Sequence, residues 1–168
     1  MTDYTKYFSW GDVIGKNKNG TGSYSFSTAN YNAGVCGKGY TLTQNITQGN
    51  TTYDAATANM GYPWKMPTKE QSQELIDDTN HSWGTLNGVN GTKIFKKTDD
   101  SKFIFLPWTG KYDQTYYDFA GRNGYCWTTV ITSGLSAPYF LVYSDGDPVV
   151  NATLAYPRSI GMTVRAIQ

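Results

Sequence analysis

The stretch "MPTKEQSQELIDDTN" (Met66–Asn80) carries the clearest helix signal of the chain and bears most directly on its fold class. Thr68 is a good N-cap residue, Gln71 completes a capping box three residues later, and Pro67 marks the entry. Such a box satisfies backbone N–H groups of the first turn, so we expect a helix here. The acidic residues of this helix share one face, which indicates a solvated surface more than an acid–base pair: Glu70, Glu74 and Asp77.

Shorter elements are expected on either side of this helix. "YDAATANMG" (Tyr53–Gly61) contains alanines and ends in glycine, which favours one short helix. "TKIFKK" and "KFIFLP" flank "TDDS" and predict a hairpin over residues 92–107. "PYFLVY" (138–143) predicts a strand, "SDGD" a turn, "PVVN" its return partner, and "MTVRAIQ" (162–168) a final strand. The expected class is α+β, with one or two helices, several short antiparallel strands and long loops.

Composition excludes several classes of protein. The 168 residues fit one domain, and a net charge of +1 with only 16% charged residues argues against a nucleic-acid binder. No apolar run reaches transmembrane length, so direct membrane insertion is not expected. The start, "MTDYTKYFSWGD", lacks the regions of a signal peptide, which leaves open whether a leader precedes it.

Catalytic and metal-binding patterns are equally scarce. The single histidine, His81, cannot supply a His-based zinc site or a triad, and we expect it on the surface. Cys36 and Cys126 are expected as two buried free thiols more than as a disulfide. Asp145 and Asp147 could begin a calcium loop, but no acidic residue follows them, so a plain turn is favoured. We expect no catalytic residue, no metal and no cofactor.

One window has an unusual composition. Residues 128–161 contain no Lys, Glu, Gln, Met or Trp, whereas the rest of the chain has eleven Lys, two Glu, six Gln, four Met and five Trp. Strands and turns are poor in Lys, Glu and Gln, but no folding preference excludes Met and Trp with them.

Six phrases in order carry a resemblance: "YFSWGD", "YDAATANMGYPWKMPTKEQSQELID", "SWGTLNGVNGTK", "FIFLPWTG", "NGYCWTT" and "RSIGMTVRAIQ". They resemble the bacterial major paralogous domain family (FISUMP), a branch of the C-type lectin fold related to formylglycine-generating enzymes. The resemblance covers nearly the whole chain and implies a single C-type lectin-like domain over residues 1–168.

Several positions depart from the family pattern. Ser72 replaces an aromatic residue on the helix, and Trp108 and Thr109 replace a small pair. The late cysteine pair of formylglycine-generating enzymes has no match at Cys36 or Cys126, and the calcium signatures of lectins are absent. The resemblance therefore implies a scaffold without either inherited chemistry.

One subset of this fold has a variable region rewritten by a diversity-generating retroelement, followed by a fixed tail that resembles "GMTVRAIQ". The retroelement substitutes template adenines, and changes at the first two bases of AAC and AAT codons cannot produce Lys, Glu, Gln, Met or Trp. These are the five residue types missing from residues 128–161. The resemblance thus implies a variable region over about these residues.

Alternation divides this window into framework and display positions. The resemblance places Ala137, Phe140 and Val142 toward the core, so the intervening Tyr139, Leu141 and Tyr143 are expected to face solvent. Family framework positions also include Trp127, Arg158, Gly161, Val164 and Arg165. The expected ligand-binding residues are Val130, Ile131, Tyr139, Leu141, Tyr143, Asp145, Asp147, Asn151, Thr153, Leu154, Tyr156, Ser159 and Ile160.

These features predict a non-enzymatic binding protein of receptor or adhesin type, with a hypervariable C-terminal face that recognises a cell-surface protein or glycan. The resemblance implies an extracellular place, on a bacterial surface or on a phage virion at the tail, and allows an oligomer. Two alternatives are an invariant bacterial surface domain with a fixed protein or glycan ligand and an oxidase of the formylglycine-generating type.

Overall fold

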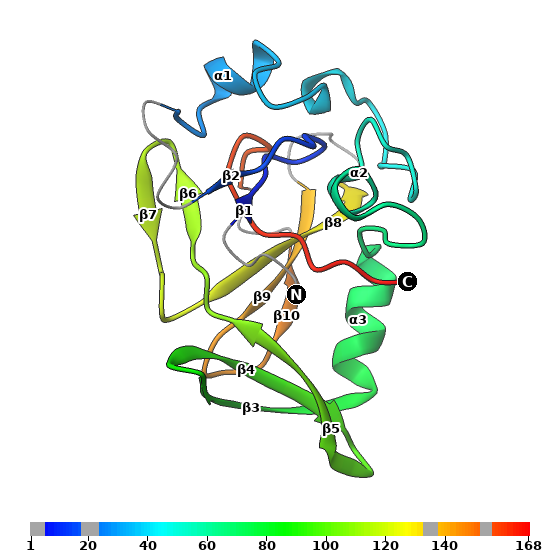
Figure 1. Ribbon diagram of the computed structural model, residues 1–168, viewed down its shortest axis with the longest axis vertical. Helices are drawn as coiled ribbons and strands as arrows, with labels where there is room; N and C mark the ends of the chain where they lie inside the picture. The colour runs from blue at the N-terminus through cyan, green and yellow to red at the C-terminus, as the bar shows by residue number, and fades with distance from the viewer. Residues whose placement is uncertain (1–5, 18–23, 133–137, 152–155) are drawn as a thin grey trace.

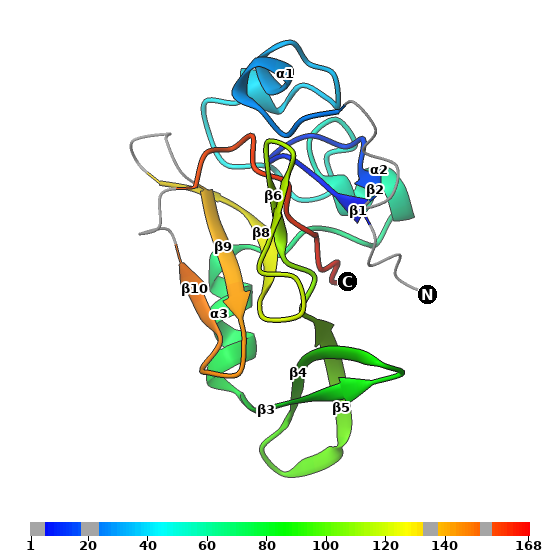
Figure 2. The same ribbon diagram turned by 90° about the vertical axis from the view of Figure 1, so that its left-hand side faces the viewer.

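The described residues form an α+β structure with three short α-helices and several small antiparallel sheets (Figure 1). The computed structural model describes residues 6–17, 24–132, 138–151 and 156–168. In two perpendicular views, a three-stranded sheet forms one end of the molecule and α1 the other (Figures 1 and 2). The strands are β1 Lys6–Tyr7, β2 Lys16–Asn17, β3 Thr79–Leu86, β4 Val89–Lys96, β5 Asp99–Pro107, β6 Lys111–Asp113, β7 Tyr116–Asp118, β8 Gly124–Ile131, β9 Pro138–Tyr143 and β10 Val149–Asn151.

Side-chain caps define the starts of the helices. In α3 (Lys69–Asp77) the Thr68 hydroxyl accepts from the Gln71 N–H and the Gln71 side chain accepts from the Thr68 N–H, so the predicted capping box is confirmed. Helix α2 (Ala55–Met60) confirms the second predicted helix and ends at Gly61. Helix α1 (Thr28–Asn32) and a 3-10 turn (Gly39–Thr41) precede them.

Strands β4 and β5 form the predicted hairpin, and β3 extends it to a three-stranded sheet. Strand β3 was not predicted, because "TNHSWGTL" lacks the alternation of a half-buried strand. His81 therefore belongs to a strand and is half-buried, with Nε2 3.2 Å from Asp147 Oδ1. With 30% of its side chain exposed, His81 lies at the surface as predicted, although in a strand that was not predicted.

A second sheet, in the order β10–β9–β8, runs through the middle of the molecule. It confirms the predicted strand "PYFLVY" and its return partner, which pair antiparallel through Val142 and Val149. Strand β9 also pairs with β8, where Trp127 lies opposite Phe140 and Cys126 opposite Leu141.

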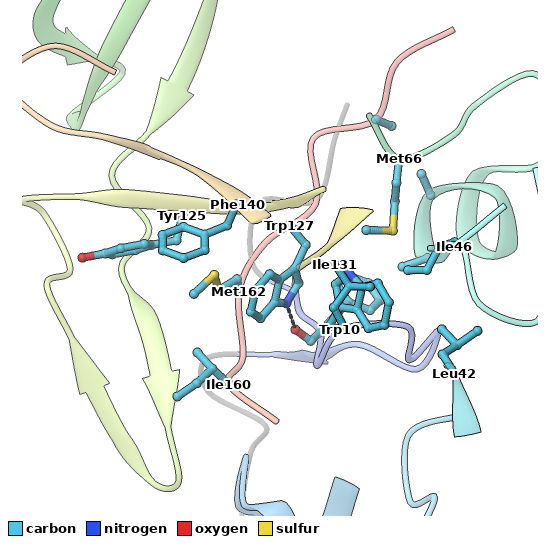
Figure 3. Close-up of a cluster of buried hydrophobic side chains, with 14 residues drawn as sticks. Trp10, Leu42, Ile46, Met66, Tyr125, Trp127, Ile131, Phe140, Ile160 and Met162 are labelled. Carbon is cyan, nitrogen blue, oxygen red and sulfur yellow. Dashed lines mark hydrogen bonds between the residues drawn. The ribbon is translucent and has the colours of Figure 1, made fainter. Parts of the chain in front are cut away.

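The main core joins the first and last parts of the chain (Figure 3). The Trp127 Nε1–H donates to the Phe8 carbonyl at 2.8 Å, and the Trp10 Nε1–H donates to the Thr128 carbonyl at 2.8 Å. Both indoles are fully buried. Buried Trp side chains with satisfied N–H groups contribute large apolar areas and also fix the geometry of the segments they join.

The last segment does not form the predicted strand over residues 162–168. It makes isolated bridges to three different partners: Met162 pairs with Phe8, Thr163 with Cys126, and Ile167 with Lys65. A regular ladder cannot form because the neighbouring backbone changes every few residues.

Candidate ligand-binding face

Strand β9 is buried on both of its faces. Phe140 is 0% exposed and packs in the main core, as predicted. Leu141 is only 3% exposed and Tyr143 only 2%, so the prediction that these two side chains face solvent is wrong. Leu141 and Tyr143 form a second core cluster with Ile94 and Leu106 of the β4–β5 hairpin. Elements distant in sequence therefore cover the face that alternation assigned to solvent.

Helix α3 completes this second cluster. Its residues Leu75 and Ile76 pack against the buried side chains of β8 and β9. The Tyr143 hydroxyl also donates to the Pro107 carbonyl at 3.3 Å. Tyr143 is thus held by packing and by a buried hydrogen bond.

Three further expected contact residues belong to the framework. Ile131 and Ile160 lie in the main core, and Ser159 is buried with its carbonyl accepting from the Ser9 hydroxyl at 2.9 Å. The prediction that these residues contact a ligand is wrong, because packing and hydrogen bonds hold both ends of the window against segments nearer the N-terminus. Asn45 Oδ1, for example, accepts from the Ile131 N–H at 3.0 Å.

The framework residues expected at the end of the window occupy fixed positions. Arg158 Nη1 donates to the Leu42 carbonyl at 2.8 Å, and its guanidinium lies 5.5 Å from the Trp10 ring centroid. Gly161 is buried against the Phe26 ring, where an added Cβ would meet ring carbons at 2.7 Å. These contacts explain why Arg and Gly suit these positions.

Some expected positions cannot be placed. Ala137, Thr153 and Leu154 lie outside the described residues, and the side chains of Val142 and Asn151 are also outside the description. The backbone of Asn151 ends β10, opposite Phe140.

Tyr139 is the most informative accessible residue of the window. It is half-buried at the start of β9, its carbonyl accepts from the Thr128 hydroxyl at 2.8 Å, and the Lys69 ammonium lies 4.6 Å from its ring centroid. The ring lines a groove of about 530 Å³ together with side chains of α3 and the residue after it: Lys69, Glu70, Gln73, Glu74, Asp77 and Asp78.

The other end of α3 borders a second hollow. Ile76, His81 and Phe95 line it together with Asp147, which is exposed on the turn between β9 and β10. Asp145 is exposed on the same turn, as a display position requires. Helix α3 lies alongside β9 and β10 (Figures 1 and 2). We use the name α3 face for the surface made of the two hollows, the exposed side of α3, and Tyr139, Asp145 and Asp147.

Two expected contact residues are only partly accessible. Tyr156 is half-buried against Phe140, at a centroid distance of 5.4 Å, and the Lys111 ammonium lies 4.6 Å from its ring. Val130 is also half-buried. The Tyr156 ring packs on the main core.

Comparisons with known proteins add no relative to this picture. No protein-family model, curated protein or solved structure matches the chain.

The structure adds α3 to the candidate site. The spacing of Glu70, Glu74 and Asp77 indicated a solvated face, and the three side chains are exposed, but no sequence signal placed them beside Tyr139. Elsewhere, Cys36 and Cys126 are free and buried, as predicted, and burial raises the pKa of both thiols. Within the described ranges, no helix is long and apolar enough to cross a membrane, and no group of three His, Cys, Asp or Glu side chains could hold a metal ion.

Proposed function

We propose that this chain is a ligand-binding protein of receptor or adhesin type, built on a C-type lectin fold, whose C-terminal window is diversified by a retroelement. Its ligand is a protein or glycan on a cell surface, and its place is extracellular, on a bacterium or a phage tail. The α3 face forms the contact surface. Neither catalysis nor a cofactor is needed for this activity.

One observation carries the proposal: the window that lacks five residue types combines deeply buried strand positions with accessible positions on the adjoining turn. Phe140, Leu141 and Tyr143 are buried, whereas Asp145 and Asp147 on the adjoining turn are exposed. Buried anchors allow the accessible positions to change without loss of the core, because surface substitutions usually alter stability by less than ~0.5 kcal/mol.

The chemistry of the face suits a macromolecular partner. Tyr139 offers a large, rigid ring with a polar tip, which gives contact area at low entropic cost. The ring borders a groove whose other walls carry both acids and Lys69, so polar groups surround an aromatic contact. An aromatic anchor with a polar rim is the usual anatomy of a protein-binding site.

The proposed lectin-type fold has support from the packing of the resembling phrases. Trp10, Met66 and Trp127 come from three different phrases and are all buried in the main core. Three of the phrases that carry the resemblance therefore contribute side chains to the main core.

The decisive test of diversification is the DNA around the gene. We expect a reverse-transcriptase gene and a near-copy of the coding region for residues 128–161 that differs only at template adenines. A locus with neither would favour an invariant surface domain with a fixed ligand.

The contact surface is tested by binding of the fluorescently labelled protein to a panel of bacterial cells in flow cytometry. Tyr139→Ala combined with Asp147→Asn should lower binding at least tenfold, since aromatic anchors dominate interface energies. Tyr62→Ala is the matched control, because Tyr62 is 92% exposed and lies outside the window. Equal loss in the control, or full binding by the double variant, would exclude the α3 face.

A further inference from the structure

A second concave site lies away from the α3 face. It is a pocket of about 240 Å³ between β1, α2, the end of β5, the β8–β9 pair and the C-terminal segment. None of the residues that line it belongs to the α3 face.

The floor and walls of this pocket are mostly apolar. Leu106, Cys126 and Tyr143 are buried at its floor, and Phe8 and Met60 contribute to its walls. The polar atoms of the floor already have partners, since the Tyr143 hydroxyl donates to the Pro107 carbonyl at 3.3 Å. The floor therefore suits a hydrocarbon group more than a polar one.

The rim carries positive charge. Lys6 and Arg165 both line the pocket and are half-buried, and no Asp or Glu lines it. Among the described residues, the salt bridges involve other cations, namely Lys69, His81, Lys102 and Lys111. Lys6 and Arg165 thus bring two cations to this apolar pocket, and neither forms a salt bridge with a carboxylate of the described residues.

The volume sets the size of a ligand. At ~30 Å³ for each water molecule of liquid, a pocket of about 240 Å³ replaces roughly eight waters, which corresponds to a chain of six to ten non-hydrogen atoms. Arg165 can hold a carboxylate through two parallel N–H donors, and Lys6 can add a point charge.

We propose that this pocket binds a small amphipathic monocarboxylate, with its hydrocarbon chain over Leu106 and Cys126 and its carboxylate between Lys6 and Arg165. This activity is independent of the α3 face. Such a ligand would also link β1 to the C-terminal segment, since Lys6 and Arg165 come from opposite ends of the chain.

The probe is octanoate, titrated into the ¹⁵N-labelled full chain and followed by amide chemical shifts. Saturable shifts at Cys126, Tyr143 and Arg165, with a dissociation constant on the order of 10⁻⁴ M, are expected for a ligand of this size. Octanamide, which has the same chain without the charge, should bind at least tenfold more weakly.

Variants at the rim separate specific binding from adhesion to apolar surface. Arg165→Met and Lys6→Met, which keep the aliphatic stems, should each weaken octanoate binding about tenfold and leave octanamide within twofold. Lys38→Met is the matched control at an exposed position outside the pocket, and its affinity should stay within twofold. The proposal is overturned by equal binding of octanoate and octanamide, by unchanged affinity in both rim variants, by the absence of saturation, or by shifts confined to α3.

Discussion

Asp12 is a carboxylate whose charge opposes folding, and its replacement by asparagine should stabilise the protein at neutral and alkaline pH. The side chain is 1% exposed. Oδ1 accepts from the Gly39 N–H at 3.0 Å, whereas Oδ2 has no hydrogen-bond partner among the described residues. Burial raises the pKa of Asp12 from 3.8 to about 6, and the Gly39 N–H lowers it only in part.

The size of the effect follows from proton linkage. Between pH 3.8 and about 6, the folded chain holds the Asp12 proton more tightly than the unfolded chain. The stability that protonated Asp12 contributes is therefore fully present below pH 3.8 and is lost as the pH rises through about 6. At 1.36 kcal/mol for each pH unit, the loss reaches ~3 kcal/mol, of which ~2.5 kcal/mol falls between pH 4 and pH 8.

Asp12→Asn removes the charge and keeps an oxygen that can accept from the Gly39 N–H. Urea unfolding followed by tryptophan fluorescence, at pH values from 4 to 8, gives the free energy of unfolding of both proteins. The difference between variant and wild type should grow by ~2.5 kcal/mol in favour of the variant from pH 4 to pH 8. All other carboxylates are present in both proteins, so their titration cancels in the difference between the two free energies of unfolding.

Asp54→Asn is the matched control. Asp54 is equally buried, but its two oxygens accept from the N–H groups of Gly49, Ala56, Thr57 and Met66. An amide nitrogen cannot accept these bonds, so this variant should lose ~1–3 kcal/mol at pH 8. A difference between Asp12→Asn and wild type that does not change with pH would refute the reasoning for Asp12.

Three further predictions test the burial of side chains around the β8–β9 pair and at both cysteines. In urea unfolding, Tyr143→Ala should lower the free energy of unfolding by ~3–5 kcal/mol. Tyr139→Ala should lower it by less than ~1.5 kcal/mol. Equal losses in the two variants would contradict the burial of Tyr143. Gly124→Ala places a Cβ against the Tyr143 ring, closer than van der Waals contact allows, and should lower the free energy of unfolding by ~1–3 kcal/mol in the same assay. An unchanged free energy would contradict this close contact. Cys36 and Cys126 should stay unmodified by a thiol reagent in the native protein at pH 8 and should react fully in urea. Both thiols are buried and their pKa values are raised, so the reactive thiolate is scarce and inaccessible in the native protein. Rapid labelling of the native protein would disprove this prediction.

Local features were predicted well from the sequence because their causes are local. The capping box of Thr68 and Gln71 and the Gly61 stop involve groups within a few residues, so the sequence letters alone indicate them. The β4–β5 and β9–β10 hairpins follow from β-rich runs around short turns. The free state of both cysteines followed from their isolation in the sequence.

Failures arose where distant segments decide the environment. Alternation along β9 separates Tyr139, Leu141 and Tyr143 from Phe140, but it cannot show that α3 and the β4–β5 hairpin cover the other face. The groove beside Tyr139 needs the same long-range contacts, so the roles of Lys69 and Glu70 there were not predictable. The C-terminal segment pairs with three partners, and no periodic pattern encodes such pairing.

The pairing of Phe8 with Met162 has a consequence for biosynthesis. The Phe8 N–H and carbonyl bond to Met162, and the Phe8 carbonyl also receives the Trp127 indole, so the first segment has no complete partner until Met162 has been made. During translation, the side chains of Phe8 and Trp10 therefore remain without this packing until synthesis has passed Met162. A chain that stops early, anywhere before Met162, leaves these aromatic side chains without cover and becomes a substrate for chaperones and proteases. Assembly of this core therefore requires a chain that extends at least through Met162.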